Sequence, residues 1–190
     1  MEKTKVIVFD KLDKRSKHCL LEYGTGFVAK QIKKFSKEYC PNVKEIPTHV
    51  AMAVYRLGAW WIYESHAKAN KELGIPSGVR RYKADKWLEI EKPEKFKAFK
   101  VKLDFKEMEE HIGESYGMGD IKALMHAAIH HTNGKQKDRK GLICSEYFAL
   151  CCKDLRKYFK ELPCWCITPA HIQYFLIQTN KKEVGNGQIH

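Results

Sequence analysis

Three side chains of this sequence have the chemistry of a cysteine nucleophile: Cys144, His49 and Glu64. Cys144 lies in the motif Gly-Leu-Ile-Cys-Ser-Glu at 141–146, which indicates the first turn of an amphipathic helix. A helix N-terminus and a protonated imidazole both stabilise a thiolate, and a carboxylate orients the imidazole. Free backbone N–H groups in this first turn, which includes Ser145, can hold an oxyanion. We therefore predict a Cys-His-Glu catalytic site, which is defined by geometry rather than by chain order.

A predicted hairpin relates His49 to Glu64. If the Leu-Gly pair at 57–58 forms a two-residue loop, position 51 pairs with position 64 and position 49 with position 66. Glu64 then lies diagonally across from His49 on one face, at about 7–8 Å between backbones, and His66 lies directly opposite. A slip of one residue would move Glu64 to the other face. Small residues at positions 51 and 53 leave room on this face for the helix of Cys144.

Each of these residues also has a structural interpretation. Most free cysteines are buried small hydrophobes, and Cys144 fits that description as well. His49 and Glu64 are equally consistent with a core histidine and a surface glutamate. Exposure and pKa decide whether a cysteine reacts, so both interpretations stay open at the level of the sequence.

Six short motifs, in this order, resemble the circularly permuted papain-fold amidases of the YiiX-like group, relatives of the NlpC cell-wall peptidases and of lecithin:retinol acyltransferase. The resemblance runs from about 24 to 177 and implies a permuted papain-like fold. It implies that His49 is the general base, Glu64 its orienting partner, Cys144 the nucleophile, and Tyr116 a residue of the cleft or the oxyanion site. At 24–26 the chain has Gly-Thr-Gly, where family members commonly have Gly-Asp. The motifs are Pro-Thr-His-Val-Ala-Met (47–52), Trp-Ile-Tyr-Glu-Ser (61–65), Gly-Val (78–79), Gly-Glu-Ser-Tyr-Gly (113–117), Ile-Cys-Ser-Glu (143–146) and Ile-Thr-Pro-Ala (167–170).

The function expected from these residues is that of a cysteine-dependent hydrolase or acyl transferase, such as a thiol protease or amidase, which needs no cofactor. Its substrate would be an amide or ester bond in a peptide, a cell-wall peptide or a lipid. The alternative is a catalytically idle papain-fold protein with a binding or structural role, for example a virion or host-interaction component.

Two other groups of residues have metal-ligand character. His126 and His130 lie one helical turn apart, but the glutamate of a helical zinc protease motif is absent between them. Cys164 and Cys166 precede His171, and a Cys-Cys pair lies at 151–152, in spacings that match no paired zinc finger. We therefore predict no metal site among the catalytic residues, and zinc binding by the cysteine-rich segment 151–171 stays open.

Composition indicates an ordinary globular protein of one domain spanning 1–190, with 44% hydrophobic and 31% charged residues. The net charge of +12 comes from scattered lysines and could attract an anionic polymer or a membrane surface. No nucleic-acid-binding module is recognisable. Seven cysteines, with no signal peptide and no membrane-spanning run, predict reduced thiols and a cytoplasmic location. A virus- or phage-encoded origin and the oligomeric state are left open.

Hydrophobic periodicity and turn residues predict an α+β fold, in which an antiparallel sheet packs against helices. We expect a helix N-cap at Thr168 with Pro169 in the first turn, and a polar, mobile tail over 180–190. The expected strands cover 5–9, 48–57, 59–66, 79–87 and 96–103, and the expected helices cover 27–39, 106–112, 118–131, 145–159 and 171–177.

Overall fold

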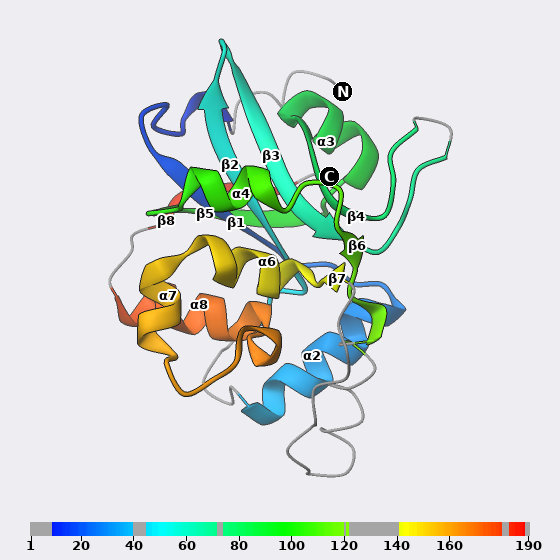
Figure 1. The fold of residues 1–190 in the computed structure, drawn as a ribbon, viewed down its shortest axis with the longest axis vertical. Helices are drawn as coiled ribbons and strands as arrows, with labels where there is room; N and C mark the ends of the chain where they lie inside the picture. The colour runs from blue at the N-terminus through cyan, green and yellow to red at the C-terminus, as the bar shows by residue number, and fades with distance from the viewer. Residues whose placement is uncertain are drawn as a thin grey trace.

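The computed structural model describes residues 9–39, 45–71, 74–119, 121, 141–179 and 183–188, which form an α+β fold (Figure 1). The strands are β1 (Lys17–Glu22), β2 (His49–Arg56), β3 (Ala59–His66), β4 (Gly78–Lys83), β5 (Lys95–Val101), β6 (Ser115–Tyr116), β7 (Gly141–Leu142) and β8 (Glu183–Gln188). The helices are α2 (Phe27–Tyr39), α3 (Ala84–Glu91), α4 (Phe105–Glu110), α6 (Cys144–Cys151), α7 (Lys153–Tyr158) and α8 (Pro169–Gln178), with a 3-10 turn η1 (Cys164–Cys166).

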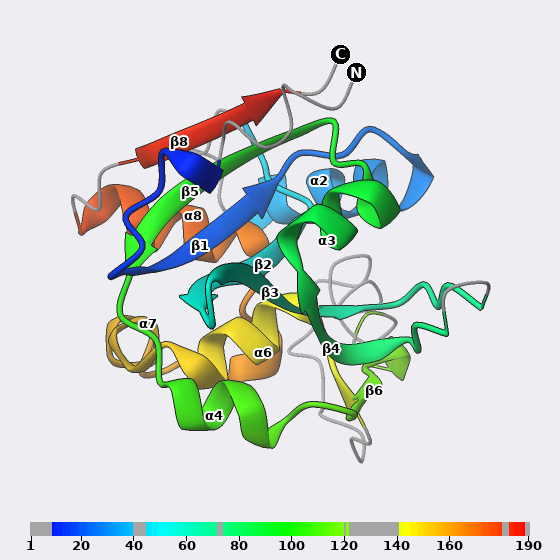
Figure 2. The same cartoon turned by 90° about the horizontal axis from the view of Figure 1, so that it is seen from above.

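Six strands form an antiparallel sheet in the order β4-β3-β2-β1-β5-β8, and Figure 2 shows β8 at its outer edge beside β5. Alternate residues of each strand point to opposite faces, so the sheet separates two hydrophobic layers. One layer packs the sheet against α6 and α8, and the other packs it against α3 and the segment that begins at Phe9. The first includes Leu21, Val50, Met52, Tyr147, Phe148, Ile172 and Phe175, and the second includes Leu20, Ala51, Ala53, Ile62, Trp87, Leu88 and Phe96.

The predicted α+β class with an antiparallel sheet is confirmed. The structure also confirms the N-cap at Thr168, whose side chain accepts a hydrogen bond from the His171 backbone N–H, with Pro169 in the first turn. Periodicity succeeds here because these elements alternate buried and exposed positions, or begin at a recognisable cap.

The structure departs from the predicted elements at the end of β4 and in the middle of the predicted helix 145–159. The predicted strand 79–87 ends at Lys83, and α3 follows without a loop. Its buried residues are Ala84, Trp87 and Leu88, and the spacing of three and four residues from Ala84 is that of a helix. The predicted helix 145–159 is divided at Cys152, whose φ of −111° and ψ of 89° interrupt it between α6 and α7.

The sequence-based prediction missed β1. Residues 18–21 of this strand are all buried, because β1 lies in the middle of the sheet with a layer on each side. A strand buried on both faces loses the alternation that identifies strands in a sequence. Of the predicted strand 5–9, residues 5–8 lie outside the described residues, and Phe9 begins a helical turn.

Of the predicted mobile tail over 180–190, residues 183–188 form β8, which pairs with β5, and the others lie outside the described residues. Backbone pairing to an open sheet edge needs no apolar sequence, so composition did not reveal it. The predicted helix 118–131 lies largely outside the described residues, although 118, 119 and 121 are helical.

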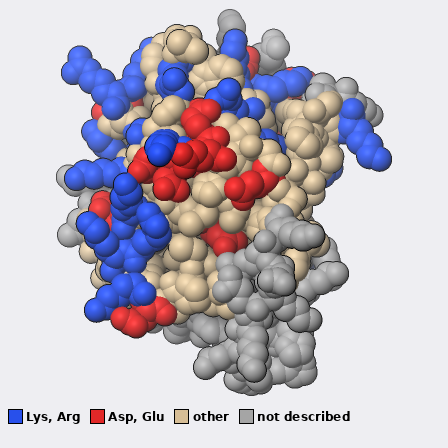
Figure 3. Space-filling view, in the orientation of Figure 1, with Lys and Arg blue, Asp and Glu red and all other residues tan. Residues whose placement is uncertain are grey.

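No helix among the described residues is long and apolar enough to cross a membrane. On the face drawn in Figure 3, acidic side chains gather over α4 and basic side chains are spread around them. This distribution fits a solvated basic surface better than one dedicated polyanion site on this face.

Candidate active site

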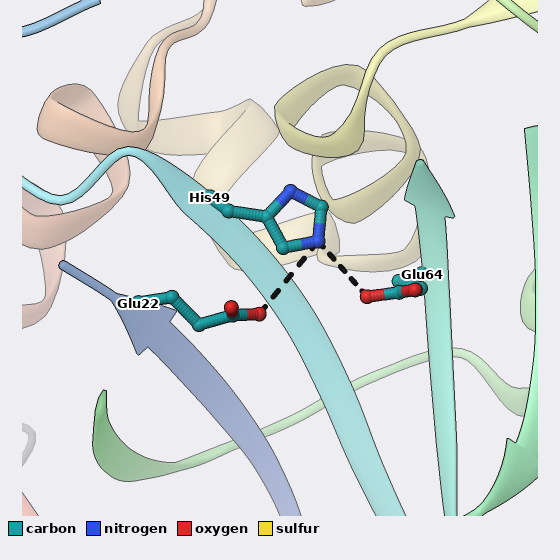
Figure 4. A group of neighbouring side chains, drawn as sticks. All are labelled: Glu22, His49 and Glu64. Atoms are coloured by element: carbon teal, nitrogen blue, oxygen red, sulfur yellow. Dashed lines mark hydrogen bonds and ion pairs between the residues drawn. The ribbon is translucent and has the colours of Figure 1, made fainter. Parts of the chain in front are cut away.

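The hairpin of β2 and β3 has the predicted register. Leu57 and Gly58 both have positive φ, at 50° and 76°, as a two-residue type I′ turn requires. Met52 pairs with Tyr63, and the same register continued along the strands places position 49 opposite position 66. His49 Nε2 lies 3.0 Å from Glu64 Oε2, across the diagonal of the pairing (Figure 4). The ring of His66 lies edge-on to that of His49, with centroids 5.1 Å apart.

Glu64 is fully buried and is an ionised acceptor. Its Oε1 accepts hydrogen bonds from Arg80 Nε at 3.0 Å, from Arg80 Nη2 at 2.8 Å and from the Tyr82 hydroxyl. Its Oε2 accepts from Trp87 Nε1 at 3.3 Å as well as from His49. Burial alone would raise the pKa of Glu64, but the hydrogen bond from His49 and the positive charges around it hold the pKa below its usual value.

Arg80 connects Glu64 to a second pair of groups. Its Nη2 lies 2.5 Å from Glu91 Oε1, and Glu91 Oε2 lies 3.3 Å from His66 Nε2. Burial and the charge of His49 lower the pKa of His66 to about 4, so His66 is neutral at physiological pH. Of the two neighbouring histidines, His49 is therefore the one that can carry a proton there.

Cys144 is the first residue of α6 and lies close enough to His49 for its charge to act on the imidazole. Burial would lower the pKa of His49, but the charges of Cys144 and Glu22 and the hydrogen bond that His49 donates to Glu64 raise it well above its usual value. Because Nε2 faces the carboxylates, Nδ1 remains for the thiol, and Figure 4 shows the Nδ1 edge of the ring turned away from both glutamates. The three predicted residues therefore lie in one group.

The helix of Cys144 reaches His49 from a direction that the sequence did not predict. α6 packs against β2 and β3 on the sheet face opposite to the small residues Ala51 and Ala53, which lie under Trp87 instead. Its N-terminus reaches His49 because His49 is the first residue of β2 and therefore lies at the edge of that sheet face.

A short parallel ladder places Tyr116 beside the Cys144 helix. β6 pairs with β7 so that Tyr116 lies opposite Leu142, two residues before Cys144. Ser65 donates a hydrogen bond to the Leu142 carbonyl at 2.5 Å, which ties this ladder to β3. Burial and the nearby charge of Cys144 raise the pKa of Tyr116, so its hydroxyl stays protonated and can donate.

A cavity of about 470 Å³ opens over this group. Cys144 and His49 both line it, although only 7% of the Cys144 surface is exposed. Ser145 also lines the cavity, and within the described part of the chain its buried hydroxyl has no hydrogen-bond partner. The other lining groups include apolar Ile32, Ile143 and Pro169, and charged Lys68, Glu91, Lys92, Glu94 and Lys95.

Sequence reasoning missed Glu22, Arg80, Tyr82 and Trp87, which surround the predicted histidine and glutamate. Arg80 carried a usable signal, because it lies on the same strand face as Tyr82, and a charged residue on a buried face needs a buried partner. Glu22 carried none, since it lies at the end of the strand that the prediction missed.

Glu22, His49 and Glu64 present ligand-type atoms within 4.8 Å of one another, a spacing that a metal ion could bridge. The oxygens of Glu64 already accept from Arg80, Tyr82 and Trp87, and a cation there would lie close to the Arg80 guanidinium. We interpret the group as a hydrogen-bonded ion-pair network.

The cysteine-rich segment of the second metal alternative forms no ligand group within the described residues. Cys151 and Cys152 are buried in the core, and His171 uses Nδ1 in the cap at Thr168. His126 and His130, the first alternative, lie outside the described residues.

Comparison of this chain with models of protein families, with curated proteins and with solved structures found no match.

Proposed function

We propose that this protein is a cysteine-dependent hydrolase or acyl transferase, in which Cys144 is the nucleophile, His49 the general base and acid, and Glu64 the group that orients His49. The placement of Cys144 beside His49, with both residues lining one cavity, is the observation that carries the proposal. In this placement, a thiol at a helix N-terminus lies beside an imidazole that a buried carboxylate orients. This is the arrangement that activates a cysteine.

The reaction follows from the positions of these groups. His49 takes the thiol proton through Nδ1, and the Cys144 sulfur attacks the carbonyl carbon of an amide or ester. A tetrahedral oxyanion forms and then collapses, while His49 returns the proton to the leaving amine or alcohol. Water or an acceptor, deprotonated by His49, attacks the thioester and frees Cys144.

The N-terminus of α6 supplies donors for the oxyanion. Ile143 caps the helix without a side-chain hydrogen bond, and helix geometry gives the first backbone N–H groups no intrahelical acceptor. We assign the backbone N–H groups of Cys144 and Ser145 to this role, with the Tyr116 hydroxyl as a further donor from the other wall.

The permuted papain-like fold belongs to the same proposal. It is supported by the order of the parts: a strand that begins with the histidine, a neighbouring strand with the carboxylate, and a later helix that begins with the cysteine and packs on that sheet. On this proposal, the substrate carries its scissile bond in a peptide, a cell-wall peptide or a lipid, because the cavity offers both apolar walls and charged edges.

An idle papain-fold binding protein would be expected to have a filled or separated site. The cavity above Cys144 and its contact with His49 favour the enzyme over that alternative.

Formation of an acyl-enzyme tests the proposal. The protein is mixed with a panel of p-nitrophenyl esters and peptide arylamides, quenched in acid, and weighed by intact-protein mass spectrometry, with peptide mapping of the adduct. We expect acylation at Cys144, and none in Cys144→Ala, which should keep the fold. Cys166→Ala is the matched control, because Cys166 is more exposed than Cys144 and lies outside the site. Acylation that persists in Cys144→Ala, or that maps to another cysteine, would refute the proposal.

A further inference from the structure

Glu22 is a second carboxylate at His49 that the proposed mechanism does not use. It is the last residue of β1 and pairs in register with His49, the first residue of β2, so the two side chains lie on the same face. Glu22 Oε1 lies 3.7 Å from His49 Nε2, on the side away from Glu64. Figure 4 shows the nitrogen between the two carboxylates.

The two carboxylates differ in how their charge is balanced. Glu64 has Arg80, Tyr82 and Trp87 as donors, whereas Glu22 Oε1 is buried and accepts no hydrogen bond within the described residues. The ion pair with His49 is the one contact of that kind that the described structure gives to Glu22. The charge of Glu22 therefore acts mainly on His49.

We propose that Glu22 is a positioning residue, which keeps His49 protonated when Glu22 itself is ionised and so maintains the general acid of the reaction in alkaline conditions. The proposal rests on the function proposed above, because it assigns a role to the His49 proton. Glu64 orients the ring and stays ionised over the whole pH range of the reaction. Glu22 adds its negative charge only at the alkaline pH at which His49 would otherwise lose its proton.

The order of ionisation follows from the surroundings. Burial and the negative charges of Glu64 and Glu91 raise the pKa of Glu22 to about 8, against the lowering effect of His49. Glu22 is therefore neutral in acid and negative above that pH, and its charge then favours the imidazolium. The groups that face this pair are Glu64 and His66 on β3, Arg80 on β4, Glu91 on α3 and Cys144 on α6.

Nuclear magnetic resonance of ¹⁵N-histidine-labelled protein measures the protonation of His49 directly, with the signal assigned from His49→Gln. We expect the midpoint for His49 to fall by at least about one pH unit in Glu22→Gln, a tenfold loss of proton affinity. Glu22→Asp, which withdraws the carboxylate by one methylene group, should give an intermediate midpoint. Glu89→Gln is the matched control, because Glu89 is exposed on α3. The His49 midpoint in this variant should equal that of the parent.

The pH profile of Cys144 acylation supplies the functional readout. In Glu22→Gln the alkaline limit should move down with the His49 midpoint, and the acid limit should stay in place, because Glu22 is neutral there. An unchanged His49 midpoint in folded Glu22→Gln and Glu22→Asp would overturn the proposal. If Cys144 is not acylated at all, the proposed function fails, and the His49 midpoint still decides whether Glu22 sets the charge of the ring.

Discussion

His49 and Glu64 lie two positions out of register on neighbouring strands, and this diagonal brings Nε2 to 3.0 Å from Oε2. The glutamate reaches the imidazole without bending either strand. Nδ1 is left on the far side of the ring, away from both glutamates. It remains for Cys144, the first residue of α6. The orientation of His49 is thus set by strand pairing and by a carboxylate that three other side chains, Arg80, Tyr82 and Trp87, hold in place.

Glu64→Gln should destabilise the protein and slow the reaction of Cys144. The substitution keeps the shape but removes the buried charge opposite Arg80, which retains only Glu91 as an ion-pair partner within the described residues. Breaking a buried pair on one side costs about 3 kcal/mol in free energy of unfolding. Urea titration measures that loss, and iodoacetamide labelling of Cys144 should slow at least about tenfold. Glu89→Gln, on the surface of α3, should leave both quantities near the parent values.

The free energy of unfolding should fall as pH rises from 6.5 to 8. Over this range the folded chain keeps protons on Glu22 and His49, whose pKa values are raised, while the unfolded chain has lost them. The folded state binds more protons, so stability declines with pH. Glu22 alone contributes about 2 kcal/mol to the decline at about 1.4 kcal/mol per pH unit. Urea titrations at several pH values should show a flatter dependence for Glu22→Gln, and an equal slope in that variant would contradict the assignment.

Tyr116→Phe should slow turnover of an ester substrate about 100-fold, because the hydroxyl that donates to the oxyanion is removed. Labelling of Cys144 by iodoacetamide forms no oxyanion, so its rate should change by less than about twofold. The two rates, measured on the same preparation, separate an oxyanion role from a general disturbance of the site. Parallel loss of both rates would assign Tyr116 to packing.

Gly141→Ala should disturb the site through the β6–β7 ladder. A Cβ at this position would lie 2.4 Å from the Ser115 carbonyl oxygen, so the two strands must separate. Overpacking of this kind costs about 1–3 kcal/mol. Calorimetry should show the loss, together with slower labelling of Cys144. At Gly119 an added Cβ meets no atom of the described residues within 4 Å, so Gly119→Ala is the matched control and should behave like the parent.

The pairing of His49 with Glu64 could be predicted from the sequence because a two-residue turn fixes the register of both strands. The bounds of α2 and β3 could be predicted for a similar reason, since their patterns are local. A prediction of this kind depends only on residues close together in the chain.

The surroundings of the pair depend on long-range packing and could not be predicted. β1 is buried on both faces, so neither the strand nor Glu22 at its end was recognisable. The approach of α6 was assigned to the wrong sheet face, because small residues at 51 and 53 make room for any neighbour, and Trp87 occupies that room. The Arg80 network required knowledge of which strand pairs with β3.

The most direct test of the central claim is the rate at which iodoacetamide labels Cys144 at pH 6, measured by peptide mapping in the parent and in His49→Asn. Because His49 activates it, Cys144 should react at this pH far faster than Cys164 or Cys166, whose side chains lie outside the site. We expect His49→Asn to remove that advantage. A Cys144 that labels no faster than Cys164 in the parent, or equally fast without His49, would contradict the account.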